Sequence, residues 1–130
     1  MKKIIKTNLI IILLLFLVLG SGYAQQVRII NNPGQQVDIF NYVVKGKITI
    51  FEFFATWNGT SNTIEPYLQR LAQDPSYIIY KIDIKEWNSP VCVQYRISSI
   101  PYFKVFDKAG NIQFEGNQAY RKMMEILSSR

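Results

Sequence analysis

The sequence predicts a single α/β domain with a central mixed β-sheet flanked by helices. Two continuous runs of apolar, β-branched and aromatic residues, 48–54 and 77–84, are typical of strands buried on both faces of a sheet. A segment with helical spacing separates them, and this alternation of strand and helix favours parallel pairing. A hairpin signal near the C-terminus adds an antiparallel edge to the same sheet.

The first 24 residues have the composition of an export signal. The opening eight residues carry three Lys, an unbroken apolar run follows over 9–19, and Gly22 and Ala24 fit the last positions before a signal-peptidase site. The run is shorter than the roughly 18–20 apolar residues that span a bilayer. We therefore expect an exported domain over 25–130, periplasmic or extracellular, with an uncleaved N-terminal membrane anchor as the alternative.

Composition excludes several classes of function. The formal charge of +6 falls to +3 without the three lysines of the signal, and the remaining Lys and Arg are scattered, so we predict no nucleic-acid partner. The chain has no His and one Cys. This leaves no nitrogen and sulfur ligand set for a metal site, no internal disulfide and no His-activated nucleophile. We expect no cofactor.

The N-terminal half is predicted as a strand, a loosely helical segment, the first buried strand and a longer helix. A short β-type run over 27–30 ends in a turn cluster, and the apolar residues of 35–45 follow helical spacing only loosely. Polar residues over 58–62 are good helix N-caps, and an apolar stripe continues to about Gln73. Pro66 is expected to kink this helix.

The C-terminal half is predicted to complete the sheet and cover it. A short helix is expected over 90–95 and a strand over 101–107. A turn at 108–110 leads into a hairpin strand over 111–115. An amphipathic helix over 118–127 closes the domain and presents Met and Leu side chains to the sheet.

The strand-to-helix junction FEFFATWNGTS at 51–61 resembles the active-site segment of the thioredoxin family. That family has an apolar strand with a buried acid, then Ala-x-Trp-Cys-x-x-Cys opening a helix with a Pro in its second turn, here Pro66. Lys81-Ile82-Asp83 is similar to the family's next strand, and the segment 95–101 is similar to the one that ends in its cis-proline. The resemblance covers essentially all of 25–130 and implies a thioredoxin-like fold.

The two redox cysteines of that family are absent. Asn58 stands where the attacking cysteine belongs, and Ser61 stands where the resolving cysteine belongs. Exchange requires a thiolate with a lowered pKa and a second thiol that releases the mixed disulfide. Dithiol–disulfide catalysis by this pair is therefore excluded, and we predict no catalytic residue here. Asn58 and Ser61 are interpreted as groups that satisfy free N–H groups at the helix start.

Glu52 is a lone carboxyl group in a strand that is otherwise almost wholly apolar. Such a group is costly to bury unless it is protonated or paired. The resemblance places Lys81 on the neighbouring strand, so we expect a buried Glu52–Lys81 pair. On this hypothesis Glu52→Ala alone lowers the free energy of unfolding by about 3–5 kcal/mol, because Lys81 is left as a buried charge without a partner. Adding Lys81→Met removes that charge and should restore part of the lost stability.

The resemblance also implies a binding groove that needs no sulfur. In the family, the turn before the cis-proline offers backbone groups to an extended peptide, a form of strand addition. The corresponding groove is predicted to be lined by Trp57, Gly59, Thr60, Ile100 and Pro101. The expected function is a non-catalytic, chaperone-like binding module, and the expected partner is an extended segment of another exported protein.

Two other functions remain open on the sequence alone. Cys92 lies in the segment SPVCVQYRI, where it is either a small buried hydrophobe or a reactive thiol that supports disulfide exchange. In the third alternative the chain is a purely structural thioredoxin-like domain.

Overall fold

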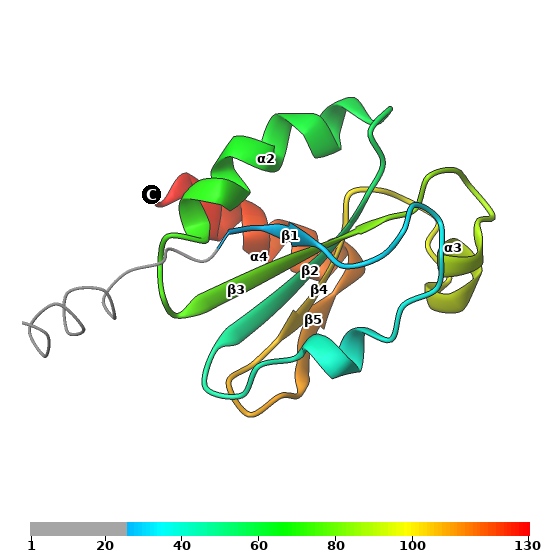
Figure 1. The fold of residues 1–130 in the computed structure, drawn as a ribbon. Coiled ribbons are helices and arrows are strands. Elements are labelled where there is room, and N and C mark those ends of the chain that lie inside the picture. Colours follow the sequence, from blue (N-terminus) through cyan, green and yellow to red (C-terminus); the bar gives the residue numbers. More distant parts are fainter. Residues whose placement is uncertain (1–25) are drawn as a thin grey trace, which may run out of the picture.

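The computed structural model describes residues 26–130, which form one five-stranded sheet between two layers of helices and loops (Figure 1). The predicted export signal and its cleavage site lie outside the described residues. Among the described residues, no helix has the length and apolar character needed to cross a bilayer.

The elements follow the predicted order. They are β1 (Arg28–Ile29), the 3-10 helix η1 (Ile39–Tyr42), β2 (Ile48–Phe54), α2 (Gly59–Leu71), β3 (Tyr77–Asp83), α3 (Pro90–Tyr95), β4 (Tyr102–Phe106), β5 (Ile112–Glu115) and α4 (Gly116–Ser128). The strand order is β1-β3-β2-β4-β5. β3 is parallel to both β1 and β2, whereas β4 is antiparallel to β2 and to β5. The predicted single-domain α/β fold with a mixed sheet is confirmed.

Each face of the sheet has its own hydrophobic core. On one face, α2 and α4 cover the sheet, as Figure 1 shows, and their apolar side chains join alternate residues of β2, β3 and β4. On the other face, η1 and α3 pack on the remaining residues of the same strands. Because strand side chains alternate between faces, Glu52 shares the α2 and α4 face with Ile50. The Glu52 side chain therefore points towards α2 and α4 and not towards η1 and α3.

The segment 35–45 differs from its predicted helix. Only the four residues of η1 are helical, and the chain becomes extended again at Val43, with φ −67° and ψ 129°. The hydroxyl group of Tyr95 accepts a hydrogen bond from the Ile39 amide at 3.1 Å and donates one to the Val37 carbonyl at 2.6 Å. The Val44 amide donates to Thr49 Oγ1 at 3.0 Å. These tertiary bonds fix an irregular path that a weak helical pattern does not outweigh.

Candidate functional site

The register of β2 and β4 brings the two ends of the predicted groove together. Phe53 of β2 pairs with Tyr102 of β4. The turn that follows β2 therefore lies beside the residues that precede β4. The Ile100–Pro101 peptide bond there is cis, as the resemblance implies. Residues more than 40 positions apart in the chain thus meet at one end of the sheet.

Asn58 is the N-cap of α2. Its backbone is extended, with φ −92° and ψ 116°, and its Oδ1 accepts a hydrogen bond from the Ser61 amide at 2.8 Å. Asn62 Nδ2 donates to the Thr56 carbonyl at 3.1 Å and closes the same turn. The bond from the Ser61 amide satisfies one of the N–H groups that a helix start leaves free, as predicted for Asn58.

Ser61 differs from Asn58, because its side chain caps nothing. The residue is 1 % exposed, and its Oγ has no hydrogen-bond partner among the described residues. Gly59 and Thr60, between the two positions, are exposed. The helix start therefore presents an amide and two small residues to solvent where the family presents sulfur.

Asn58→Ala is expected to lower the free energy of unfolding by about 1 kcal/mol, because the Ser61 amide loses its acceptor. Asn58→Asp keeps that acceptor and serves as the matched control, with stability close to that of the wild type. Urea unfolding followed by circular dichroism measures both. An Asn58→Ala variant as stable as Asn58→Asp would show that the cap does not stabilise α2.

Trp57 presents about half of its surface, 51 %, to solvent. Its indole Nε1 donates to the Lys85 carbonyl at 2.6 Å, and its ring meets Trp87 edge to face at 5.6 Å. Trp87 is itself 45 % exposed. Lys85 and Asn88 both adopt the left-handed conformation with φ 63°, which shapes the loop that carries Trp87. The contact of Trp87 with Trp57 is not predictable from the sequence, because the loop that carries Trp87 has no recognisable motif.

The segment before the cis-proline has unused backbone groups. Ser98 and Ser99 are exposed, and Ile100 is partly exposed. Within residues 26–130, no hydrogen bond involves the backbone amides or carbonyls of these three residues. An exposed run of free N–H and C=O groups is able to pair with an added strand. Ile100 and Pro101 remain partly exposed beside it.

Glu52 and Lys81 are cross-strand neighbours, as predicted, but they are not an isolated pair. Lys81 Nζ lies 3.5 Å from Glu52 Oε1, and its hydrogen bond goes instead to Glu65 Oε2 of α2. Glu52 is fully buried, and neither of its oxygens has a hydrogen-bond partner among the described residues. The part played by Glu65 is not predictable from the sequence, since a Glu on a helix face gives no signal that it contacts a lysine of the sheet.

This arrangement changes the expected cost of removing Glu52. Burial raises the pKa of Glu52 from its ordinary value of 4.5 to about 8, against the opposing effect of Lys81, and the charge of Glu65 raises it further. At neutral pH Glu52 is then a neutral acid. Because Glu65 remains as an ionic partner for Lys81, Glu52→Ala strands no buried cation. The double variant with Lys81→Met is therefore not expected to recover stability.

Cys92 is buried, with 2 % of its surface exposed. Its Sγ lies 3.7 Å from the Glu86 carbonyl oxygen, and its amide donates to Ser89 Oγ at 3.4 Å. It packs in the core cluster on the α3 face of the sheet with Val91 and Ile97. These surroundings fit a small core side chain rather than an attacking thiolate, which requires access to its substrate.

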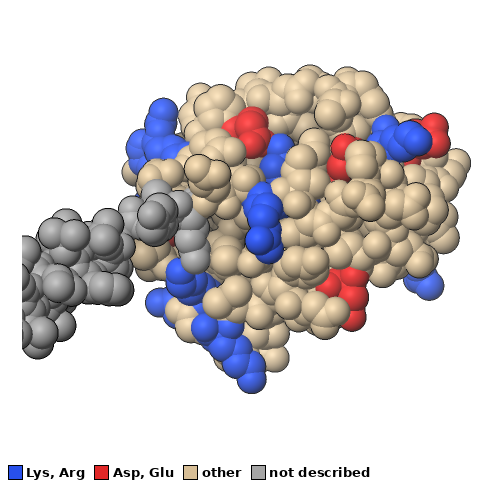
Figure 2. Space-filling view, viewed as in Figure 1, with Lys and Arg blue, Asp and Glu red and all other residues tan. Residues whose placement is uncertain are grey.

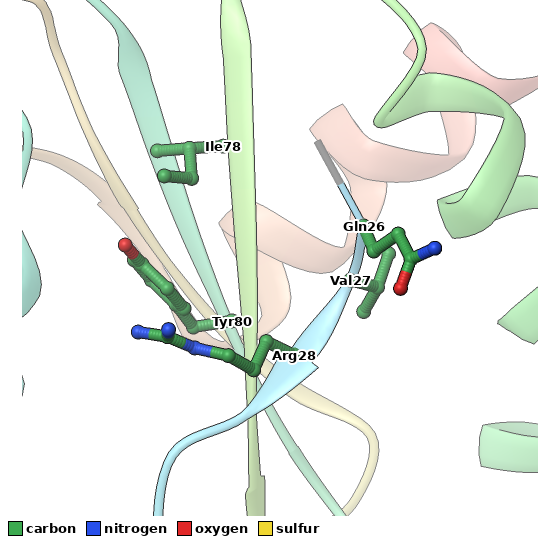
Figure 3. Close-up of a pocket in the computed structure, with 5 residues that line it drawn as sticks. All are labelled: Gln26, Val27, Arg28, Ile78 and Tyr80. Atoms are coloured by element: carbon green, nitrogen blue, oxygen red, sulfur yellow. The ribbon is translucent and has the colours of Figure 1, made fainter. Parts of the chain in front are cut away.

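A hollow on the described surface lies away from these residues (Figure 3). It lies at the edge of the sheet, where Arg28 of β1 extends over the ring of Tyr80 of β3 at 5.5 Å, with Ile78, Val27 and Gln26 nearby. Figure 2 shows Lys and Arg in separate groups on the face in view, with Asp and Glu beside some of them. Within residues 26–130, no three His, Cys, Asp or Glu side chains gather as a metal site would require.

Comparisons with known proteins agree with the fold. The thioredoxin family model matches residues 34–129. Thioredoxin-T of Drosophila melanogaster is 33 % identical over 72 residues, and protein disulfide-isomerase of Triticum aestivum is 28 % identical over 96 residues. These matches cover 54 % and 68 % of this chain, but only 45 % and 19 % of those relatives. The matched part is thus less than half the length of either relative.

Solved structures show the same fold at lower identity. Thioredoxin f from spinach chloroplast has a TM-score of 0.61 at 20 % identity, over 84 % of this chain and 96 % of that one. Reduced Schistosoma mansoni thioredoxin has a TM-score of 0.58 at 24 % identity, over 81 % and 98 %. With a family match that spans almost all of the described residues, the chain belongs to the thioredoxin family.

Proposed function

We propose that this protein is an exported, non-catalytic member of its family that binds extended segments of other proteins. The binding site is the groove between Trp57 and the segment 98–101. The partner's backbone pairs with the free groups of Ser98 to Ile100, and its side chains contact the exposed indole.

Two features at the same end of the sheet carry the proposal: the free backbone of 98–100 before β4 and the exposed Trp57 after β2. A thioredoxin-family site without its two cysteines keeps strand addition and loses covalent capture. The small side chains of Gly59 and Thr60 leave the approach open. Hydrogen bonds to main-chain groups give affinity without requiring a particular sequence, which suits a chaperone-like module.

Export is part of the proposal and rests on the composition of the first 24 residues. The lysines, the apolar run and the small residues at 22 and 24 support secretion to the periplasm or the extracellular space. In that compartment unfolded or extended segments of other exported proteins are the available ligands.

Trp57→Ala is expected to remove the partners that the wild type recovers after cross-linking in the exported fraction of the source cells. The matched control is Phe40→Ala, since Phe40 is 61 % exposed and contacts Phe106 from η1, away from the groove. Phe40→Ala should recover the same partners as the wild type. Partners that survive Trp57→Ala unchanged would reject the groove as the binding site.

A further inference from the structure

Beneath α2, one lysine lies within ion-pair distance of two carboxyl groups. Lys81 from β3 lies within reach of Glu52 on β2 and of Glu65 on α2, and it donates its hydrogen bond to Glu65. Glu52 is fully buried, whereas the Glu65 side chain is 32 % exposed. The three groups therefore join two strands and a helix through a single cation.

The other neighbours of this cluster carry no charge. Phe103 of β4 pairs with Glu52, and the ring of Phe54 lies 4.0 Å from Lys81 Nζ. From α4, the buried residues on this face of the sheet are Ala119, Met123 and Leu127. Lys81 and Glu65 are therefore the charged groups that act on Glu52.

We infer that Lys81 and Glu65 form a tie between α2 and the sheet that is released when Glu52 loses its proton. With Glu52 neutral, Lys81 is free to pair with Glu65. Once Glu52 ionises, the buried carboxylate requires the cation more strongly than Glu65 does, because water reaches Glu65 and not Glu52. Lys81 then turns to Glu52, and Glu65 becomes solvated.

Glu65 lies at a point of α2 where the helix depends on its ion pair with Lys81. Glu65 precedes Pro66, which has no amide to donate to the carbonyl one turn earlier, so the helix lacks a hydrogen bond at this point. The half of α2 before Pro66 buries Ser61 and Ile64, and the half after it buries Leu68 and Leu71. Release of Glu65 should therefore loosen the first half and leave the second half in place.

Hydrogen exchange of the α2 amides, corrected for the intrinsic rate at each pH, tests this inference. In the wild type, the protection factors of residues 62–65 should fall about tenfold between pH 6.5 and 9, the equivalent of one pKa unit in free energy. Those of residues 68–71 should change only as far as the global free energy of unfolding, measured by urea at the same pH values, changes. Glu65→Gln should show low protection over 62–65 at both pH values.

Glu125→Gln is the matched control, because Glu125 is an exposed partner of Lys122 on α4. This variant should keep the wild-type pH dependence. A second readout is the pKa of Glu52 from its carboxyl carbon shift, which should fall by about one unit in Glu65→Gln because a like charge is lost and Lys81 is released. Wild-type protection that does not change with pH overturns the inference, as does a Glu65→Gln variant indistinguishable from Glu125→Gln.

Discussion

Replacing Asn58 and Ser61 together by cysteine is expected to give the protein a dithiol–disulfide exchange activity that these two positions cannot supply in the wild type. The first turn of α2 would place one thiol at the free amides of the helix start, which lowers the pKa of a cysteine there. The second would fill the buried position of Ser61, close enough to resolve a mixed disulfide. Reduction of insulin by dithiothreitol should accelerate at least about tenfold, since a lowered pKa raises the thiolate fraction near pH 7 by that order.

The matched controls are the two single variants and the double variant combined with Cys92→Ser. Each single variant lacks a resolving or an attacking thiol and should stay at the wild-type rate. The double variant should keep its activity without Cys92, because that thiol is buried on the α3 face of the sheet. A folded double variant with no more activity than the wild type would show that the residues around positions 58 and 61 no longer support disulfide exchange.

Stability is expected to fall as pH rises from about 5 to 8, because Glu52 is buried as a neutral acid. Its pKa is raised from 4.5 to about 8 in the folded state, so the folded protein holds a proton that the unfolded chain releases. The stability that the bound proton of Glu52 contributes is fully present below pH 4.5, and it is lost as the pH rises through the folded-state pKa of about 8. At about 1.4 kcal/mol per pH unit, the loss amounts to about 3–5 kcal/mol.

Urea unfolding at four pH values measures this slope, and Glu52→Gln supplies the comparison. Gln resembles the protonated acid and does not titrate, so its variant should have nearly constant stability over the same range. The chain has no His, which is the side chain that ordinarily titrates between pH 5 and 8. No histidine therefore adds to the pH dependence that Glu52 gives to the free energy of unfolding. A wild type whose stability does not fall with pH would contradict the neutral state of Glu52.

The sequence was sufficient for the parts of the fold with a strong local signal. The strands 48–54 and 77–84 are long, apolar and β-branched, and the helix 90–95 begins with Ser89 and Pro90, so their positions agree closely with the structure. The segment 35–45 has no such signal. Its path depends on hydrogen bonds with Tyr95, which lies far away in the chain, and on one with Thr49 at the start of the next strand. No helical or strand pattern within the segment encodes these bonds.

The candidate site was predictable where family motifs mark it and not elsewhere. The motif at 51–61 placed Trp57 and Asn58, and the register of β2 and β3 made Lys81 a neighbour of Glu52. Glu65 and Trp87 carry no motif. Their roles arise because α2 lies over β3 and because the loop after β3 folds back towards the indole of Trp57. Such side-chain contacts depend on tertiary packing, which spacing alone does not specify.

Selection of cysteine-free random peptides displayed on phage tests most directly whether the groove binds extended segments without thiol chemistry. We predict enriched peptides that bind the wild type and Cys92→Ser with the same Kd, and that bind Trp57→Ala at least about tenfold more weakly, the cost of losing one aromatic anchor. Phe40→Ala should bind as the wild type does. Failure to enrich any cysteine-free peptide over Trp57→Ala, or binding that disappears in Cys92→Ser, would contradict a groove that works through the backbone and Trp57.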